Sequence, residues 1–326
     1  MLEMKNIKFK KIFGTVEAGA ILLTLVVVLV FAIGTKGLWL KNLPYVFILA
    51  APIGIVTIGQ AVLMISGEVD LSVGSVYALI GLSFILFLNS GFGVMLSLLF
   101  SIALSCTMGL FHALVVMKLN VPSMIATLGM QFLYRGFVYI LTGGISIQIP
   151  GSLKSHQLIR FFAGKFLGIR TSILLLILIM VIFMVVLAWT RFGNHLFAVG
   201  RDPASALTCG VSAAKVKTIA FVVCSLLAGL GGIIAACQEG AVYATTASGS
   251  ELETIAAAVI GGCLLTGGVG SIWGAVLGIF SLLSLKGGLL MIGAPAYWYI
   301  LFVGLIFIVF LIVSKLLIRG FYGKSN

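Results

Sequence analysis

The residues best suited to chemistry lie in a short polar stretch between two long apolar runs. It reads GEVDLSVGS over residues 67–75 and carries the carboxylate of Asp70 at its centre. Acidic residues are costly at membrane depth, so a carboxylate in this place needs a structural or a transport reason. Asp70 could accept hydrogen bonds from the free amides of Ser72 or Val73 as the N-cap of the next helix. The alternative is that Asp70, Ser72 and Gly74 lie on the path of a solute.

A second candidate is Arg135, the charge deepest within a predicted span. Placing a charge there costs about 2.5–3.5 kcal/mol on insertion scales. Its guanidinium should therefore face protein or water, or reach out along its flexible stem. It could pair with a helix C-terminus or with Asp70, or it could line the solute path. Gln60, Thr127 and Gln131 are polar candidates for the same lining.

The remaining reactive side chains do not form a catalytic group. The three histidines, His112, His156 and His195, fall in different predicted segments, and the five cysteines are scattered without metal-ligand spacing. Residues 323–325 read GKS, but the preceding glycine of a P-loop is missing. We therefore predict that the chain is not an enzyme, binds no metal or cofactor and does not hydrolyse ATP.

The composition defines the class of protein. The 326 residues are 61% hydrophobic and 9% charged, whereas a soluble domain is roughly 25% charged. The sequence therefore predicts a single all-α, polytopic membrane domain over 1–326. A net charge of +12 could suggest nucleic acid, but the basic residues lie beside apolar runs, as the positive-inside rule predicts.

The apolar runs leave room for about ten transmembrane helices of about 20 residues each. The predicted spans are 15–34, 44–66, 73–88, 93–117, 123–143, 172–189, 218–236, 254–266, 271–290 and 297–314. With residues 1–14 inside, both termini are cytoplasmic. This orientation places more lysines and arginines inside than outside, which favours it over its inverse.

Two predicted loops are longer than simple connections. The outer one, 144–171, carries Ile159, Phe162 and Phe166 at helical spacing, which predicts a short interfacial helix. The inner one, 190–217, contains Asp202 followed by Pro203, an N-cap and first-turn pair. A short helix should run from there to about residue 209.

Two glutamates, Glu251 and Glu253, are predicted to flank an outer span end. Ser250 and Glu253 have capping-box spacing. The alternative is contact with an external partner protein.

The chain also contains a weak internal repeat. VGSVYAL at 73–79 is echoed by VGSIWGA at 269–275, and each follows a glycine-rich break. Duplicated halves with matched helix breaks occur in transporters, where the breaks mark the pathway. Chance similarity between glycine-rich helix starts stays as an alternative.

Four motifs along the chain together resemble those of the permeases of bacterial sugar-type ATP-binding cassette (ABC) importers. They are DLSVGS at 70–75; PSMIATLG at 122–129 with YRG at 134–136 and LTGG at 141–144; GRDPA at 200–204, continuing to 217; and ELETIAAAVIGG at 251–262 with TGGVGS at 266–271. The chain departs from the pattern at Glu68, where the family usually has glycine, and at Cys263 and Val269.

The resemblance implies a multi-pass permease of the bacterial cytoplasmic membrane that moves a monosaccharide or similar small polar solute. It implies ABC ATPase subunits that supply ATP and magnesium, an external sugar-binding protein, and a second permease copy that is identical or related. The coupling helix would use a set of residues of the inner loop: Arg201, Asp202, Pro203, Ala204, Ser205 and Gly210. A stand-alone secondary transporter or facilitator is the alternative.

Overall fold

A computed structural model of the chain describes residues 17–295 and 297–322. The predicted segment 1–14 lies outside the described residues. The longer helices are α2 (Ala18–Gly34), α3 (Leu38–Ile65), α4 (Val73–Asn89), α5 (Val94–Ala113), α6 (Ser123–Thr142), α8 (Thr171–Trp189), α11 (Ala213–Glu239), α13 (Ile272–Met291) and α14 (Trp298–Tyr322). The shorter ones are η1 (Leu114–Lys118), η2 (Gly151–Leu153), α7 (Gln157–Ala163), α9 (Arg191–Arg201), α10 (Pro203–Thr208) and α12 (Ser250–Ile260). The all-α class is confirmed.

The helices differ in whether they can cross a bilayer. Within the described residues, six are long and apolar enough by length and composition: α3, α5 with η1, α6, α8, α11 and α13. Shorter apolar helices lie within α2, α4 and α14. Helix α12 has 11 residues, about 16 Å at 1.5 Å per residue, and cannot cross a core of about 30 Å. The predicted eighth span at 254–266 is therefore wrong: the helix begins earlier, ends at Ile260 and is too short.

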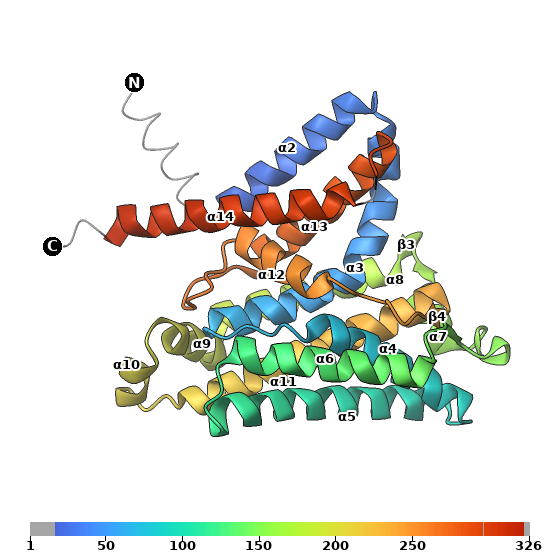
Figure 1. Cartoon of the computed structure of the whole chain (residues 1–326), viewed down its shortest axis with the longest axis horizontal. Helices are drawn as coiled ribbons and strands as arrows, with labels where there is room; N and C mark the ends of the chain where they lie inside the picture. The colour runs from blue at the N-terminus through green and yellow to red at the C-terminus, as the bar shows by residue number, and fades with distance from the viewer. Residues whose placement is uncertain (1–16, 296, 323–326) are drawn as a thin grey trace.

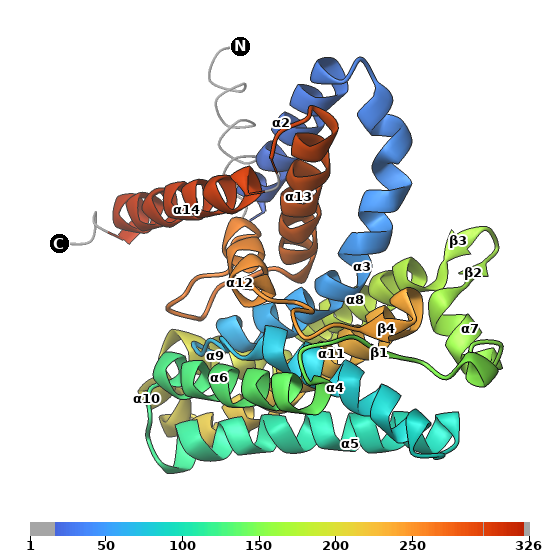
Figure 2. The same cartoon turned by 45° about the vertical axis from the view of Figure 1, so that its right-hand side comes forward.

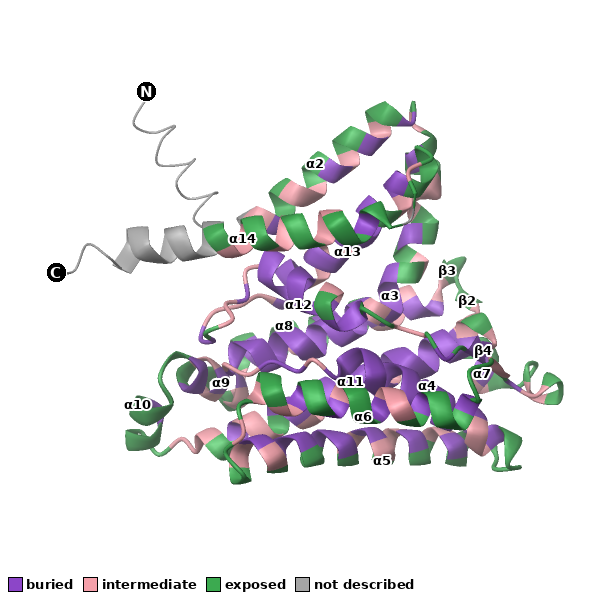
Figure 3. Ribbon diagram, viewed as in Figure 1, coloured by how far each residue is buried: buried purple, intermediate pink, exposed green. Residues whose placement is uncertain are grey.

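Helices α3 and α11 form the centre of the molecule. They have 78% and 72% of their most apolar windows buried, against 28% for α6 and for α8. Figure 1 shows α4, α5, α6 and α11 packed side by side, while α2, α13 and α14 lean away from them, as the turned view in Figure 2 also shows. Burial is correspondingly dense along α3, α4 and α11 in Figure 3. Because the outer helices leave apolar faces open, these faces are suited to lipid or to another membrane protein.

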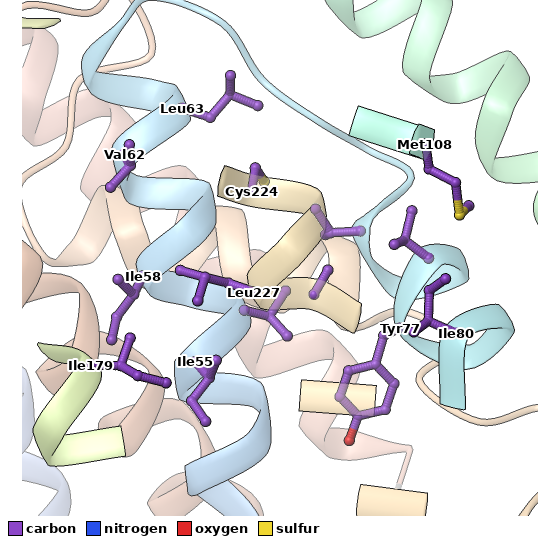
Figure 4. Close-up of a cluster of buried hydrophobic side chains, with 14 of the residues drawn as sticks. Ile55, Ile58, Val62, Leu63, Tyr77, Ile80, Met108, Ile179, Cys224 and Leu227 are labelled. Atoms are coloured by element: carbon purple, nitrogen blue, oxygen red, sulfur yellow. The ribbon is translucent and has the colours of Figure 1, made fainter. Parts of the chain in front are cut away.

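The core is built from branched aliphatic side chains and close helix approaches. In Figure 4, Ile55, Ile58 and Val62 of α3 lie near Leu227 of α11 and Ile179 of α8. Glycine allows the helix backbones to approach each other, as small residues do in membrane helix pairs. A methyl group added at Gly109 would lie 2.6 Å from the Cα of Val222, and one added at Gly232 would meet the Tyr77 carbonyl oxygen.

The two ends of the bundle carry different structures. Helices α9 and α10 lie at one end, and α7 lies at the other with a hairpin of β2 (Lys165–Phe166) and β3 (Ile169–Arg170) (Figure 1). Strand β1 (Ile147–Gln148) pairs antiparallel with β4 (Ala241–Val242) at this second end.

The predicted interfacial helix is present as α7, but its environment differs. Ile159 and Phe162 are buried against the protein, and α7 packs on α8 and α11. Phe166 lies in β2 and is 58% exposed. Helical spacing identified the apolar face of the helix, whereas its burial depends on neighbours that are remote in sequence.

Candidate translocation and coupling site

Helical structure is interrupted between α3 and α4, and we call this non-helical segment the break. Asp70 lies inside the break and is fully buried. Its Oδ1 accepts hydrogen bonds from the Ser72 amide at 2.7 Å and from the Ser72 hydroxyl at 2.6 Å. The prediction that Asp70 accepts from this amide is confirmed. Its second oxygen, Oδ2, lies 3.1 Å from Nδ1 of His112 on α5. Asp70 is not the N-cap of α4, because Ser72 occupies that position and no side chain caps the helix. The Asp70 carboxylate instead joins the break to a neighbouring helix.

His112 extends this contact to two further helices. Its Nε2 lies 3.1 Å from the Tyr134 hydroxyl on α6, and its Nδ1 lies 3.3 Å from the Ser225 hydroxyl on α11. The imidazole is fully buried, like the carboxylate that it faces. A buried charge needs a partner that compensates its lost hydration. The sequence did not identify this group, because its members come from four distant segments.

The backbone of the break is bonded by side chains. Thr127 Oγ1 accepts from the Leu71 amide at 3.0 Å. The Gln60 amide lies 3.2 Å from both the N and the O of Asp70, in the orientation that donates to the O and accepts from the N. Gln60 and Thr127 are both fully buried. In this conformation they support the break and do not line an open path, because non-helical backbone at depth must find internal partners.

The unusual Glu68 has a charge partner. Its Oε1 lies 2.5 Å from Nζ of Lys217, near the start of α11, with both side chains mostly buried. The extra negative charge relative to the family pattern is thereby compensated, and the contact ties the break to the segment that follows α10.

Four glycines from three segments meet beside this ion pair; we call Gly67, Gly200, Gly267 and Gly268 the glycine junction. A methyl group on Gly267 would lie 2.7 Å from Cα of Gly67 and 2.8 Å from the Gly200 carbonyl oxygen. One on Gly200 would lie 2.5 Å from the Gly268 nitrogen. Gly67, Gly267 and Gly268 have φ values of 89°, 83° and 73°, which favour glycine.

The junction brings the two glycine-rich breaks of the predicted repeat into contact. The Gly268 amide donates to the Ile65 carbonyl at 2.9 Å, which joins the end of α3 to the turn before α13. Gly200 packs between them from α9. Backbone therefore meets backbone, with no side chain between the three segments.

The loop at 190–217 contains the predicted short helix. Helix α10 runs from Pro203 to Thr208, and Asp202 accepts from the Ala204 amide at 3.0 Å. The Ser205 hydroxyl, followed by the amides of Ala204 and Ser205, donates to Asp202 and holds the pKa of that carboxyl below its usual value. Gly210 turns the chain with φ 80°. The preceding helix α9 was not predicted.

Arg135 is bonded to a loop. Its Nη1 donates to the carbonyls of Ala244 and Thr246 at 3.3 and 2.8 Å, in the segment between β4 and α12. The expected pairing with Asp70 or with a helix C-terminus is therefore wrong, because His112 is the partner of Asp70.

Glu251 and Glu253 lie in the first turn of the short helix α12. Glu251 is buried, and its Oε1 accepts from Nε2 of Gln131 at 2.7 Å, so its carboxylate does not face an external partner. Glu253 is partly buried beside Lys286 and Tyr299. The capping box is absent here, since Ser250 donates to the Ala247 carbonyl. Gly74 packs against the Ser250 hydroxyl, which would lie 2.8 Å from an added methyl group.

Among the described residues, no group of three or more histidine, cysteine, aspartate or glutamate side chains could hold a metal ion. The five cysteines are free thiols.

The fold and this arrangement are those of a membrane transport protein, in which two apolar helices are joined by a non-helical segment that holds a buried carboxylate. The chain belongs to the family described as branched-chain amino acid transport system / permease component, whose model matches residues 42–311. It is thus a permease subunit of the ABC importer class.

Similar proteins include autoinducer 2 import system permease proteins LsrC. The one from Yersinia pseudotuberculosis serotype O:3 (strain YPIII) is 34% identical over 272 residues, covering 82% of this chain and 75% of the relative. The one from Yersinia enterocolitica serotype O:8 / biotype 1B is 34% identical over 268 residues, covering 82% and 73%. No solved structure matches the chain.

Proposed function

We propose that this chain forms the gate of an ATP-driven importer of a small, neutral, sugar-like solute. Relatives that share 34% of their residues over most of this chain are permeases for autoinducer 2 import. The motifs of the sequence resemble those of sugar-type permeases. Both comparisons favour a small polyhydroxylated solute.

The observation that carries the proposal is the glycine junction. Helix α9 leads directly into α10, and the last turn of α9 packs through Gly200 against the α3 end and the turn before α13. Close-packed backbone cannot absorb a displacement as flexible side chains do. Movement of α10 by a docked ATPase would therefore pass to the break that holds Asp70.

The partners follow from this role. We propose that separate ATPase subunits dock on α10 and supply ATP and magnesium, and that a binding protein delivers the solute at the end that carries α7. The open faces of α5, α6 and α8 are available to a second permease copy, identical or related, and to lipid. The chain would then lie in the bacterial cytoplasmic membrane with both termini inside.

Transport would proceed by alternating access driven from outside the chain. A nucleotide can shift such an equilibrium only through different affinities for the two states. The permease reconstituted by itself should therefore move no sugar against a gradient. Uphill uptake without an ATPase subunit would support the alternative, a stand-alone secondary transporter.

The coupling role of α10 can be tested with charge reversals. Arg201→Glu changes an exposed residue and should leave the fold intact. We expect it to lower solute-stimulated ATP hydrolysis and uptake about tenfold in the reconstituted importer, with loss of ATPase co-purification. Lys118→Glu is the matched control, an exposed cation in η1 outside α9 and α10. Equal effects of both variants would contradict the assignment.

The junction can be tested by adding a methyl group. Gly200→Ala should preserve ATPase binding, because α10 is unchanged, but should abolish uptake while hydrolysis continues. Normal uptake by this variant would show that movement does not pass through the junction.

A further inference from the structure

The segment between β4 and α12 has no regular helix or strand, and it is bonded by Arg135 from well inside α6, a helix long enough to cross a bilayer. Residues 243–249 form turns after Val242 and lead into Ser250, and Figure 1 shows them running inward from the end that carries α7. Arg135, which bonds this segment, is the thirteenth residue of the 20-residue helix α6. At 1.5 Å per residue, it lies about 18 Å along a helix of about 30 Å.

This irregular segment is not covered by the rest of the chain. Tyr243, Thr245, Ser248 and Gly249 are exposed. Lipid-exposed irregular backbone does not occur in the hydrocarbon region, where it is tolerated only when protein covers it or when it lines a water-filled cavity. Two of the exposed residues, Thr245 and Ser248, carry hydroxyls, which suits water and not lipid.

The segment is held under strain. Ala247 has φ 55°, a left-handed conformation that residues with a Cβ rarely adopt. Such strain persists only where surrounding contacts fix it, and it gathers at functional sites. Here the contacts include the two hydrogen bonds from Arg135 to the carbonyls of Ala244 and Thr246 and the bond from the Ser250 hydroxyl to the Ala247 carbonyl.

A buried carboxylate oxygen lies at the inner end of the segment. Oε1 of Glu251 accepts from Gln131, but Oε2 is buried and has no hydrogen-bond partner among the described residues. Glu251 as a whole is 8% exposed. An unpaired carboxylate oxygen in a buried place is costly, and a donor that approaches it is bound strongly.

We infer that residues 243–249, with Gln131 and Glu251, line the translocation pathway, and that Oε2 of Glu251 accepts a hydroxyl of a small neutral polyol as it passes. A carboxylate oxygen accepts, while the hydroxyls of Thr245 and Ser248 both donate and accept, and this combination matches a polyhydroxylated solute. The inference rests on the proposed function for the solute class. The aqueous lining rests on the structure alone.

The lining is tested by thiol labelling in the assembled importer. Ser248→Cys is introduced after Cys106 and Cys209 are replaced by serine, and a charged methanethiosulfonate reagent is applied with and without nucleotide. We expect labelling at least tenfold faster than for Leu99→Cys, an exposed position on α5, and a rate that changes with nucleotide. Labelling as slow as that of Leu99→Cys would refute the inference that residues 243–249 line an aqueous pathway.

The contact of Glu251 with solute is tested by uptake. Labelled D-ribose, D-xylose and D-galactose serve as probes, and Glu251→Gln should raise the KM of the transported sugar about tenfold, or 1.4 kcal/mol. Glu239→Gln, an exposed position at the end of α11, is the control and should stay within twofold. Equal KM values for both variants would overturn the contact.

The two proposals fail in different ways. If Ser248→Cys labels rapidly but none of the sugars is taken up by the wild-type importer, the solute class is wrong and the lining stands. If a sugar is transported while Ser248→Cys is inert and Glu251→Gln behaves as Glu239→Gln does, the inferred pathway is wrong.

Discussion

Replacing His112 by leucine should destabilise the protein more than replacing Asp70 by asparagine. Leucine leaves the Asp70 carboxylate buried without the imidazole that faces its Oδ2, and removing one partner of a buried pair costs about 3–5 kcal/mol. Asparagine retains an Oδ1 that can accept both bonds from Ser72, now 2.7 and 2.6 Å long. The imidazole left behind keeps its contacts with the hydroxyls of Tyr134 and Ser225. We therefore expect Asp70→Asn to lower the free energy of unfolding by about 1–2 kcal/mol.

The double variant gives the sharper test. Asp70→Asn combined with His112→Leu leaves no uncompensated charge, so it should be more stable than His112→Leu alone. Apparent melting temperatures in detergent, followed by tryptophan fluorescence, provide the ranking. Ser101→Ala is the control, a buried hydroxyl on α5 that bonds only within its own helix, and it should cost about 1 kcal/mol. A double variant no more stable than His112→Leu would refute the charge argument.

Three further predictions concern other contacts. Hydrogen bonds lower the pKa of Asp202, the N-cap of α10, in the folded protein. Its stabilisation of α10 should therefore be fully present above the usual aspartate pKa and be lost as the pH falls through the lowered pKa. Hydrogen exchange of α10 amides from about pH 6 to about pH 3 measures this; unchanged protection would contradict it. Glu68→Lys should reduce uptake, and Lys217→Glu in the same chain should restore it; lack of rescue in transport assays would exclude their ion pair. Gly232→Ala should cost about 1–3 kcal/mol by overpacking, whereas Gly129→Ala, which meets open space, should be neutral or slightly stabilising in melting experiments.

Local pattern predicted the helices well. Apolar runs identified the positions of the long helices, and Asp202 with Pro203 marked the start of α10, because caps and proline act on their own neighbours. The eighth span was wrong because the run at 254–266 contains glycines that end α12 at Ile260. Hydrophobicity indicates burial but does not measure helix length.

The site was harder to predict, because its contacts are remote in sequence. Asp70 and Arg135 were identified as costly charges, but their partners, His112 and the carbonyls at 244 and 246, could not be read from spacing. Glu251 was expected near an external surface, whereas tertiary packing buries it against Gln131. A charged residue in an apolar segment predicts that it has a polar partner, but the identity of that partner depends on the tertiary structure.

The glycine junction also limits how the docking loop can be exchanged. In the proposed coupling, the surface that selects an ATPase lies on α10, whereas α9, which leads into α10, packs against the other two segments through Gly200. A chimera that grafts residues 190–217 from another importer should assemble only if the graft presents a bare backbone where it meets the turns at 67 and 267–268. The choice of ATPase and the packing against the permease would thus depend on neighbouring stretches of one loop. The residues of α10 could then be redesigned while the packing at Gly200 is kept.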